Sequence, residues 1–417
     1  MKLRRFGLVL AVVLAAVTGN AGVAYTDPAP PAAAVALRLP APTGPYSVGV
    51  TEVHLVDSGR ADPWHPDQRR ELMVQIWYPA AVDRGAPAAP WMPSGGRQAQ
   101  NAYLDELGVP EGSWILAPSH SHQDAPALTG HGRFPILLKS PGMTDTTGWS
   151  TAQAEDLAGH GYAVVAINHT HEAFSVHFPD GRETVTEVAL DSPQEVLRDL
   201  LLPTRVADTR FVLDRFAEAA GGPDSQQVLP PALAARLDLS KVGMFGHSLG
   251  GSTTAQAIHD DPRIRAGANL DGPILGSVAT DGLDRPLLML ASGNYPWSDD
   301  PGWQPGWPNN TGLKIPLRME GTEHMSFCDQ QAILPQLAAA GLLPADTVTR
   351  TVGGIDPDRS IDLQRDYLRA YFDAAFGRIG TDIVGTITSL AQPEMLPHPL
   401  PDRFDTEVGL FGSGGRG

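Results

Sequence analysis

The chain has 417 residues and 42% of them are hydrophobic, which is enough for a large core in one domain with insertions. Its formal net charge is −17, and no run rich in Lys or Arg follows the first few residues. This composition argues against nucleic acid or an anionic membrane surface as a partner, since both require a basic patch. The one cysteine, Cys328, excludes an internal disulfide.

The first 24 residues have the pattern of a secretory signal peptide. A basic start precedes an apolar run over residues 6–17, and the small residues Gly22 and Ala24 suit cleavage after Ala24. The run is shorter than the roughly 20 apolar residues that a membrane span requires. We therefore expect a secreted protein without a stable membrane span; an uncleaved anchor is the alternative.

Changes in composition divide the chain that follows. Residues 25–45 are rich in Pro and Ala and are interpreted as an exposed linker, so the folded domain is expected at 46–380. Residues 46–57 and 69–80 have strand-like composition and predict an antiparallel hairpin at the edge of a sheet. Periodicity fades over 82–133, which indicates an insertion that resembles a lid.

From residue 133 on, buried-strand patterns alternate with helical patterns. Residues 133–170 form a strand–helix–strand unit, and the alternation continues to an amphipathic helix at 360–377. A long helical pattern over 192–220 is interrupted at Pro203, and Pro and Gly become frequent again in a C-terminal tail, 381–417. This order predicts an α/β fold, with a mostly parallel sheet and helices on both faces.

The segment Gly246-His247-Ser248-Leu249-Gly250 stands between a strand pattern and a helical pattern. In that context G-x-S-x-G is typical of a nucleophile turn, because the glycines allow a tight connection that leaves the serine oxygen exposed. The start of the helix also stabilises negative charge that develops beside it. We predict that Ser248 is a nucleophile; a glycine-rich turn without chemistry is the alternative.

A serine nucleophile needs a histidine base and a carboxylate that orients the base. In this type of sheet they follow the serine in the order acid, then histidine. His324 lies in a polar loop after a strand, whereas His259 belongs to the helix that Ser248 starts and His398 lies in the tail. We therefore predict His324 as the base.

Asp271 ends a strand and precedes Gly272, so its carboxylate is expected at the carboxyl edge of the sheet. Asp299 and Asp300 are the rival carboxylates, one strand later and deep in a Trp-rich loop at 292–312. We predict Asp271 as the acid; an ordinary turn aspartate is the alternative.

The oxyanion hole is expected to consist of two backbone N–H groups, those of Leu249 and Met143. Leu249 follows the nucleophile, and Met143 lies in the loop after an earlier strand, directly behind Pro141-Gly142. An ordinary Pro-Gly turn is the alternative for the second position.

These motifs resemble those of the α/β-hydrolases of the secreted platelet-activating-factor acetylhydrolase family and their bacterial lipase-like relatives. Over about residues 46–376, VQIWYPA resembles an early strand of the family, GHSLGG its nucleophile turn, LDG its acid segment and EHMSFCD its histidine loop. The resemblance implies ester hydrolysis and catalytic roles for Ser248, Asp271 and His324. Ser-Pro-Gly-Met at 140–143 departs from the family's Ser-His-Gly-x, so the Met143 donor is carried over by position.

His169, His171 and Glu172 lie at the end of a strand, where pocket-lining residues are found in such folds. We interpret His169 as a substrate-binding residue. A metal site at this cluster is the alternative, but no matching ligand group is evident elsewhere, so we predict no metal.

Three tryptophans, Trp297, Trp303 and Trp307, stand in the loop 292–312. Aromatic side chains on a loop beside a site bind apolar or sugar-like surfaces. We expect these three to contact substrate; packing of the loop against the body is the alternative.

The sequence therefore predicts a secreted serine hydrolase that cleaves small-molecule or lipid carboxylic esters through an acyl-enzyme, with no cofactor. The same three residues would also serve an amidase or a polyester hydrolase, because the choice of scissile bond depends on the shape of the pocket. A non-catalytic binding protein on the same fold is a further alternative.

Overall fold

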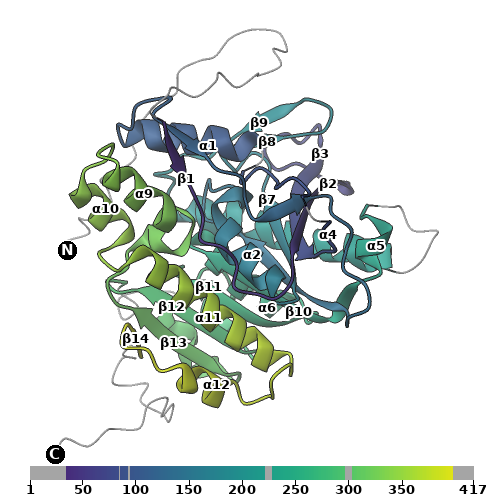
Figure 1. Ribbon diagram of the computed structural model, residues 1–417. Helices are drawn as coiled ribbons and strands as arrows, with labels where there is room; N and C mark the ends of the chain where they lie inside the picture. Colours follow the sequence, from purple (N-terminus) through teal and green to yellow (C-terminus); the bar gives the residue numbers. More distant parts are fainter. Residues whose placement is uncertain (1–33, 84, 93, 221–227, 296–302, 398–417) are drawn as a thin grey trace, which may run out of the picture.

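The computed structural model describes residues 34–83, 85–92, 94–220, 228–295 and 303–397. A ten-stranded sheet runs through the protein (Figure 1). From one edge to the other its strands are β14 (Met395–Pro397), β13 (Lys314–Met319), β12 (Leu287–Ser292), β11 (Ile264–Leu270), β10 (Leu237–His247), β6 (Phe134–Ser140), β7 (Ala163–Asn168), β3 (Arg69–Pro79), β2 (Val48–Ala61) and β5 (Ser121–Gln123).

The six strands from β13 to β7 run parallel to one another. The pairs β13–β14, β7–β3 and β3–β2 are antiparallel. This confirms the predicted mostly parallel sheet with an antiparallel hairpin, β2–β3, toward its N-terminal edge. Two small two-stranded sheets pair β1 (Val35–Leu37) with β4 (Trp114–Leu116), and β8 (Ser175–His177) with β9 (Glu183–Val185).

Helices lie on both sides of the sheet (Figure 1). They are α1 (Ser94–Glu106), α2 (Thr151–Gly159), α3 (Gln194–Val196), α4 (Leu202–Ala220), α5 (Pro231–Ala234), α6 (Leu249–Asp260), α7 (Val278–Asp281), α8 (Trp303–Gly306), α9 (Gln330–Ala339), α10 (Ala345–Val352), α11 (Pro357–Ala375) and α12 (Ile383–Leu390).

Each central strand contributes to two cores, because successive side chains of a strand point to opposite faces. In β10, Met244 belongs to the core shared with α4 and α6, and the next residue, Phe245, belongs to the core shared with α2, α11 and α12. Since β10 and β11 are parallel neighbours, their carboxyl ends meet at one edge of the sheet. Ser248 and Asp271 directly follow these two ends.

The helical pattern over 192–220 continues through Pro203 with a local change of winding. A π-helical turn, Leu197–Leu201, precedes α4, and Pro203 is the second residue of α4. Inside a continuous helix a proline removes one N–H and its ring clashes with the preceding turn, and the wider π-turn directly before Pro203 accommodates both effects. The predicted interruption is therefore a π-turn rather than a break in the helix.

The linker expected at 25–45 differs from the structure in its second half. From residue 34 on the segment belongs to the fold, since β1 pairs in parallel with β4 and the side chains of Leu37 and Leu39 are buried. The many Pro and Ala residues around them dilute this short apolar alternation in the sequence.

The insertion at 82–133 is anchored to the body of the protein. Leu104 of α1 and Trp114 of β4 belong to a buried cluster that also contains Trp149 and Ile333 from the body. Its strand β5 pairs with β2 and forms one edge of the sheet. Its action as a lid stays a prediction.

The tail expected at 381–417 is folded as far as residue 397. Helix α12 packs on the core of α11 through the buried Ile387, and β14 pairs with β13 and buries Met395. The frequent Pro and Gly residues of this stretch indicated a tail, and α12 and β14 are too short to give a clear periodic pattern in the sequence.

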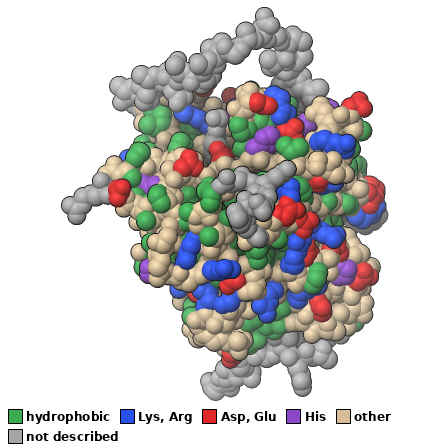
Figure 2. Space-filling model, turned by 90° about the vertical axis from the view of Figure 1, so that its right-hand side faces the viewer, with side chains coloured by type: hydrophobic (Ala, Val, Ile, Leu, Met, Phe, Trp, Pro, Cys, Tyr) green, Lys and Arg blue, Asp and Glu red, His purple; other side chains and the backbone are tan. Residues whose placement is uncertain are grey.

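Within the described ranges, no helix has the length and apolar character to cross a membrane. On the face shown in Figure 2, Lys and Arg side chains are interspersed with Asp and Glu rather than gathered in one basic field.

A chain that ends at residue 380 should be less stable than one that ends at residue 397. It lacks the buried side chains of Ile387 and Met395, and loss of one such side chain costs about 2–5 kcal/mol. Urea unfolding of both truncated chains measures the difference. Equal midpoints would contradict the assignment of α12 and β14 to the folded domain.

Candidate active site

Ser248 occupies a strained turn between β10 and α6. Its backbone has φ 55° and ψ −123°, a conformation that residues other than glycine rarely adopt. A Cβ atom on Gly246 would lie 2.1 Å from the carbonyl oxygen of Gly250, and one on Gly250 would lie 2.0 Å from that of Ser140. The two glycines therefore permit the turn that brings Ser248 out at the edge of the sheet.

Ser248 is hydrogen-bonded to His324, and His324 to Asp271. The distance from Ser248 Oγ to His324 Nε2 is 3.0 Å, and that from His324 Nδ1 to Asp271 Oδ2 is 2.7 Å. His324 begins a short 3-10 helix after β13, so the three side chains follow the ends of β10, β11 and β13 at one edge of the sheet. The structure thus brings together the serine, histidine and carboxylate that the sequence singled out.

Both carboxylate oxygens of Asp271 have a hydrogen-bond partner. Its Oδ1 accepts a hydrogen bond from the backbone N–H of Ser292 at 2.6 Å, while Oδ2 contacts His324. Burial would raise the pKa of the Asp271 carboxyl, but the hydrogen bond and charge of His324 and the Ser292 N–H outweigh it and bring this pKa below its ordinary value. The group is therefore a carboxylate at neutral pH.

The ionised Asp271 in turn favours a proton on His324. Burial lowers the pKa of the His324 imidazole, but the hydrogen bond and charge of Asp271 more than offset this, and the pKa lies above its ordinary value. An imidazole oriented through Nδ1 presents Nε2 to Ser248 as an acceptor. Of the rival residues, His259 pairs with Asp260 at 2.7 Å on α6, and Asp299, Asp300 and His398 lie outside the described residues.

Two backbone amides beside Ser248 are suited to hold an oxyanion. Leu249 is the first residue of α6, so its N–H has no partner within the helix. Among the described residues, the N–H of Met143 donates to no other group. The side chains of Met143 and Leu249 belong to one apolar cluster, so the two residues lie in the same part of the site.

The chain matches the family model "Platelet-activating factor acetylhydrolase, isoform II" over residues 32–374. The chain belongs to this family. A probable 1-alkyl-2-acetylglycerophosphocholine esterase of Arthroderma benhamiae is 27% identical, over 82% of this chain and 89% of its own. The platelet-activating factor acetylhydrolase of Gallus gallus is 21% identical, over 78% and 81%.

A solved structure, the ferulic acid esterase from Streptomyces cinnamoneus, is similar to this member of the family. It shares 32% sequence identity with a TM-score of 0.67, over 81% of this chain and 93% of the other. These comparisons confirm the α/β-hydrolase fold and the family expected from the motifs, and they identify the chain as a carboxylic-ester hydrolase.

In this family member, the loop that carries Met143 is held from behind by the guanidinium of Arg205. The guanidinium donates to the carbonyl of Pro141 at 2.6 Å and to that of Gly142 at 2.9 Å. Its remaining N–H groups meet the buried carboxylate of Glu172, which balances its charge. Because both carbonyls point toward Arg205, the next amide, that of Met143, is left free for another acceptor.

Sequence reasoning missed Arg205, and it assigned His169 to the pocket. The structure differs at His169, which is 2% exposed and has both ring nitrogens in contact with protein atoms. Its Nε2 lies 3.1 Å from Ser140 Oγ, and its Nδ1 lies 2.9 Å from Asp208 Oδ2. His169 therefore supports the strand end before the Met143 loop from inside the core.

A second pair that the sequence did not reveal connects the loops of Met143 and His324. Asp145 Oδ2 accepts from the N–H of Gly142 at 3.1 Å and lies 3.3 Å from His247 Nδ1. His247 Nε2 lies 2.9 Å from the carbonyl oxygen of His324, which can only accept, so Nε2 carries the hydrogen. His247, the residue before Ser248, thus fixes the backbone of His324.

Further apolar side chains pack with those of Met143 and Leu249. We call this group the Leu249 cluster. Its members are the buried Val188, Leu201 and Leu249 and the partly buried Trp64, Met143, Val196, Leu197, Leu200 and Leu275.

Of the three tryptophans expected at the substrate, Trp297 lies outside the described residues. Trp303 begins α8, and its side chain is outside the described part of the chain. Trp307 is half-buried and packs against the core of α4 and α6, which is the alternative considered for it.

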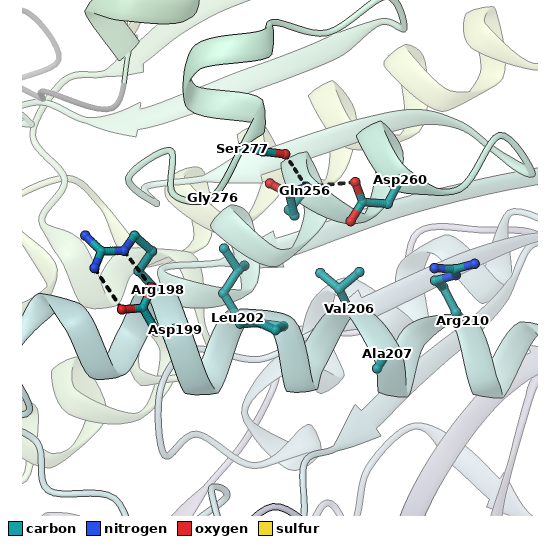
Figure 3. A pocket seen from close by; sticks show the side chains of 11 residues that line it. Arg198, Asp199, Leu202, Val206, Ala207, Arg210, Gln256, Asp260, Gly276 and Ser277 are labelled. Carbon is teal, nitrogen blue, oxygen red and sulfur yellow. Dashed lines mark hydrogen bonds and ion pairs between the residues drawn. The ribbon is translucent and has the colours of Figure 1, made fainter. Parts of the chain in front are cut away.

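A hollow of about 520 Å³ lies between α4 and α6, with Leu202 and Val206 on one wall and Gln256 and Asp260 on the other (Figure 3). Ser277 is the one serine among its lining residues, and these include no histidine or cysteine. It therefore offers no nucleophile with a base, unlike the edge at Ser248.

Replacing Arg205 by Met should lower the catalytic rate on esters by roughly 100-fold or more, the typical cost of a misplaced oxyanion donor. It should also destabilise the fold by about 3–5 kcal/mol, since Glu172 becomes an unpaired buried charge. Kinetics at saturating p-nitrophenyl ester and urea unfolding measure the two effects. Arg210→Met, on the exposed side of the same helix, is the matched control.

The double variant Arg205→Met/Glu172→Met separates positioning from folding. It should regain much of the lost stability, because no buried charge is left unpaired, but not the lost activity, because the carbonyls of the Met143 loop still lack their donor. Recovery of activity together with stability would contradict the positioning role.

Proposed function

We propose that this chain is an exported serine esterase in which Ser248, His324 and Asp271 form a catalytic triad. The observation that carries the proposal is the unbroken hydrogen-bonded sequence from Ser248 Oγ to His324 at 3.0 Å and from His324 to Asp271 at 2.7 Å. Its members come from the positions and in the order that the fold uses for such triads. The free amides of Leu249 and Met143 would hold the oxyanion.

In the acylation step, Ser248 Oγ attacks the ester carbonyl carbon while His324 Nε2 takes the hydroxyl proton. Asp271 stabilises the imidazolium that forms, and the oxygen of the tetrahedral intermediate accepts from the two amides. The bond to the alcohol then breaks, and His324 returns the proton to the departing oxygen. Water attacks the acyl-enzyme in the same way and restores Ser248.

The apolar side chains of the Leu249 cluster favour a substrate whose acyl group is apolar. These side chains lie beside the two amides, where the carbonyl of the bound ester would sit. One relative is named for an acetyl ester of a glycerophosphocholine and the other for ferulic acid. The acyl groups of both esters, acetyl and feruloyl, are small. We infer that the chain accepts short aliphatic or aromatic acyl groups, with the alcohol part turned toward solvent.

Export rests on the signal-peptide pattern of residues 1–24, which lie outside the described residues. The expectations of no nucleic-acid partner and no cofactor stay predictions.

Replacing Ser248 by Ala should abolish hydrolysis of short p-nitrophenyl esters with the fold retained, because the residue left has no oxygen to form the acyl-enzyme. Ser277→Ala, in the separate hollow, is the matched control and should keep full activity. Turnover by Ser248→Ala at the wild-type rate would overturn the assignment. Labelling of the wild type by a fluorophosphonate, lost in Ser248→Ala, excludes a binding protein without catalysis.

The value of kcat/KM should rise with pH, with an apparent pKa above the ordinary histidine value of about 6.5. Below that pKa His324 is an imidazolium and accepts no proton from Ser248, and Asp271 raises this pKa. Replacing Asp271 by Asn should lower kcat by roughly 10⁴-fold and move the remaining pH profile toward lower pH. A profile that is unchanged by Asp271→Asn would contradict the pairing.

A graded panel of esters, with matched anilides and a polyester film, identifies the substrate class. We expect the highest kcat/KM for short acyl or cinnamoyl esters. Faster cleavage of the anilides or of the film would instead favour an amidase or a polyester hydrolase with the same triad.

A further inference from the structure

A second cluster of chemically active side chains lies outside the candidate active site. It consists of His65 from the β2–β3 connection, His171 from the loop after β7, and Glu187 from the segment after β9. One potential ligand atom from each residue lies within 4.8 Å of the other two. The sequence pointed to His171 but grouped it with its neighbours His169 and Glu172, whose side chains the structure turns toward Asp208 and Arg205 instead.

We propose that His65, His171 and Glu187 form a binding site for a divalent transition-metal ion of the zinc type. Two imidazole nitrogens and one carboxylate oxygen are a typical three-residue set for Zn²⁺, with a fourth position left for water. None of these three residues belongs to the proposed triad, so the proposal does not depend on the proposed esterase mechanism.

The ligand atoms of the three side chains lie within the range from which a small adjustment gives a tetrahedral site, all within 4.8 Å of one another. Glu187 Oε1 lies 2.5 Å from His65 Nε2 and 3.0 Å from His171 Nδ1. Ligand atoms around Zn²⁺ are separated by about 3.4 Å, given metal–ligand distances of about 2.0–2.1 Å. The side chains of His65 and Glu187 are 37% and 40% exposed, so both can make the small outward movement that an ion requires.

The imidazole of His171 has a buried nitrogen that is not hydrogen-bonded. The residue is 7% exposed, and its Nδ1 is a buried atom without a hydrogen bond, since the contact with Glu187 has poor geometry. Its backbone has φ 65°, which is unusual for a histidine. The fold therefore holds a strained residue so that an unsatisfied nitrogen faces the other two side chains.

One buried guanidinium prearranges both histidine-bearing segments. Arg70, fully buried, donates to Asp62 Oδ2 at 2.8 Å and to the carbonyl of Thr170 at 2.7 Å. Asp62 accepts in turn from the backbone N–H of His65 at 3.1 Å, and Thr170 directly precedes His171. A third backbone contact, from the N–H of Glu187 to the carbonyl of His171 at 2.8 Å, fixes the last ligand.

A bound ion would join two parts of the substrate pocket wall. Trp64 and Val188 are the immediate neighbours of His65 and Glu187, and both belong to the Leu249 cluster. The ion would thus hold these two segments together beside the oxyanion loop. Its expected effects are higher thermal stability and a lower KM, with no part in the bond-breaking steps.

The test uses the full-length or processed chain, stripped with a chelator and titrated with CoCl₂ and ZnCl₂. We expect one ion per chain, visible d–d absorption of tetrahedral cobalt, and a rise in Tm on addition of zinc. The variants His65→Gln and His171→Asn should weaken binding by more than the roughly 10–100-fold that loss of an outer-shell group costs. Asparagine at 171 tolerates the positive φ, so this variant should fold.

His177→Gln is the matched control. His177 is 37% exposed and faces Glu183 at 3.4 Å, so it reports unspecific binding to a surface histidine–glutamate pair. It should leave the affinity unchanged. No binding by the wild type, or equal binding by wild type and His65→Gln, would overturn the proposal.

Ser248→Ala separates this proposal from the esterase. It should bind cobalt like the wild type although it hydrolyses no ester. Loss of activity in Ser248→Ala without any metal binding would overturn the metal site alone, while metal binding with undiminished turnover would overturn the triad alone.

Discussion

The buried ion pair of Arg205 and Glu172 is the interaction on which the rest of the site depends. An arginine without exposure to water is costly unless its charge and all its N–H groups are satisfied. Here Glu172 balances the charge, and the carbonyls of Pro141 and Gly142 and the hydroxyl of Ser140 accept the other hydrogen bonds. The Gly142 carbonyl and the Met143 N–H belong to one planar trans peptide and point in opposite directions. By holding the carbonyl, the buried Arg205 therefore turns the Met143 N–H away from the core.

This ion pair is one end of a longer buried polar network. From Arg205 it passes through the hydroxyl of Ser140 to His169, then to Asp208 and finally to Arg70. Buried polar groups that are all satisfied make a structure rigid, whereas loss of one member leaves the others unpaired. The network therefore joins the candidate active site and the candidate metal site through one connected set of contacts.

The parts of the site that follow from local patterns could be predicted from the sequence. Gly246 and Gly250 around Ser248, between a strand and a helix, restrict the backbone enough to identify the turn, and the order of strands indicates where Asp271 and His324 meet. Arg205 could not be predicted, because its partners stand 33 and more positions away and no periodicity marks them. The same holds for His65, His171 and Glu187, which three separate connections bring together.

The backbone contact that holds Asp271 has a consequence for how such enzymes diversify. Asp271 is secured by Ser292, the last residue of β12, and His324 by His247, the last residue of β10. Each anchor is thus a strand end, which the hydrogen bonds of the sheet hold in place. Exchanges among the other apolar side chains of the Leu249 cluster, which supply neither anchor, can alter which esters fit without disturbing the reacting groups. Selection can therefore act on substrate range and on bond cleavage as nearly separate traits.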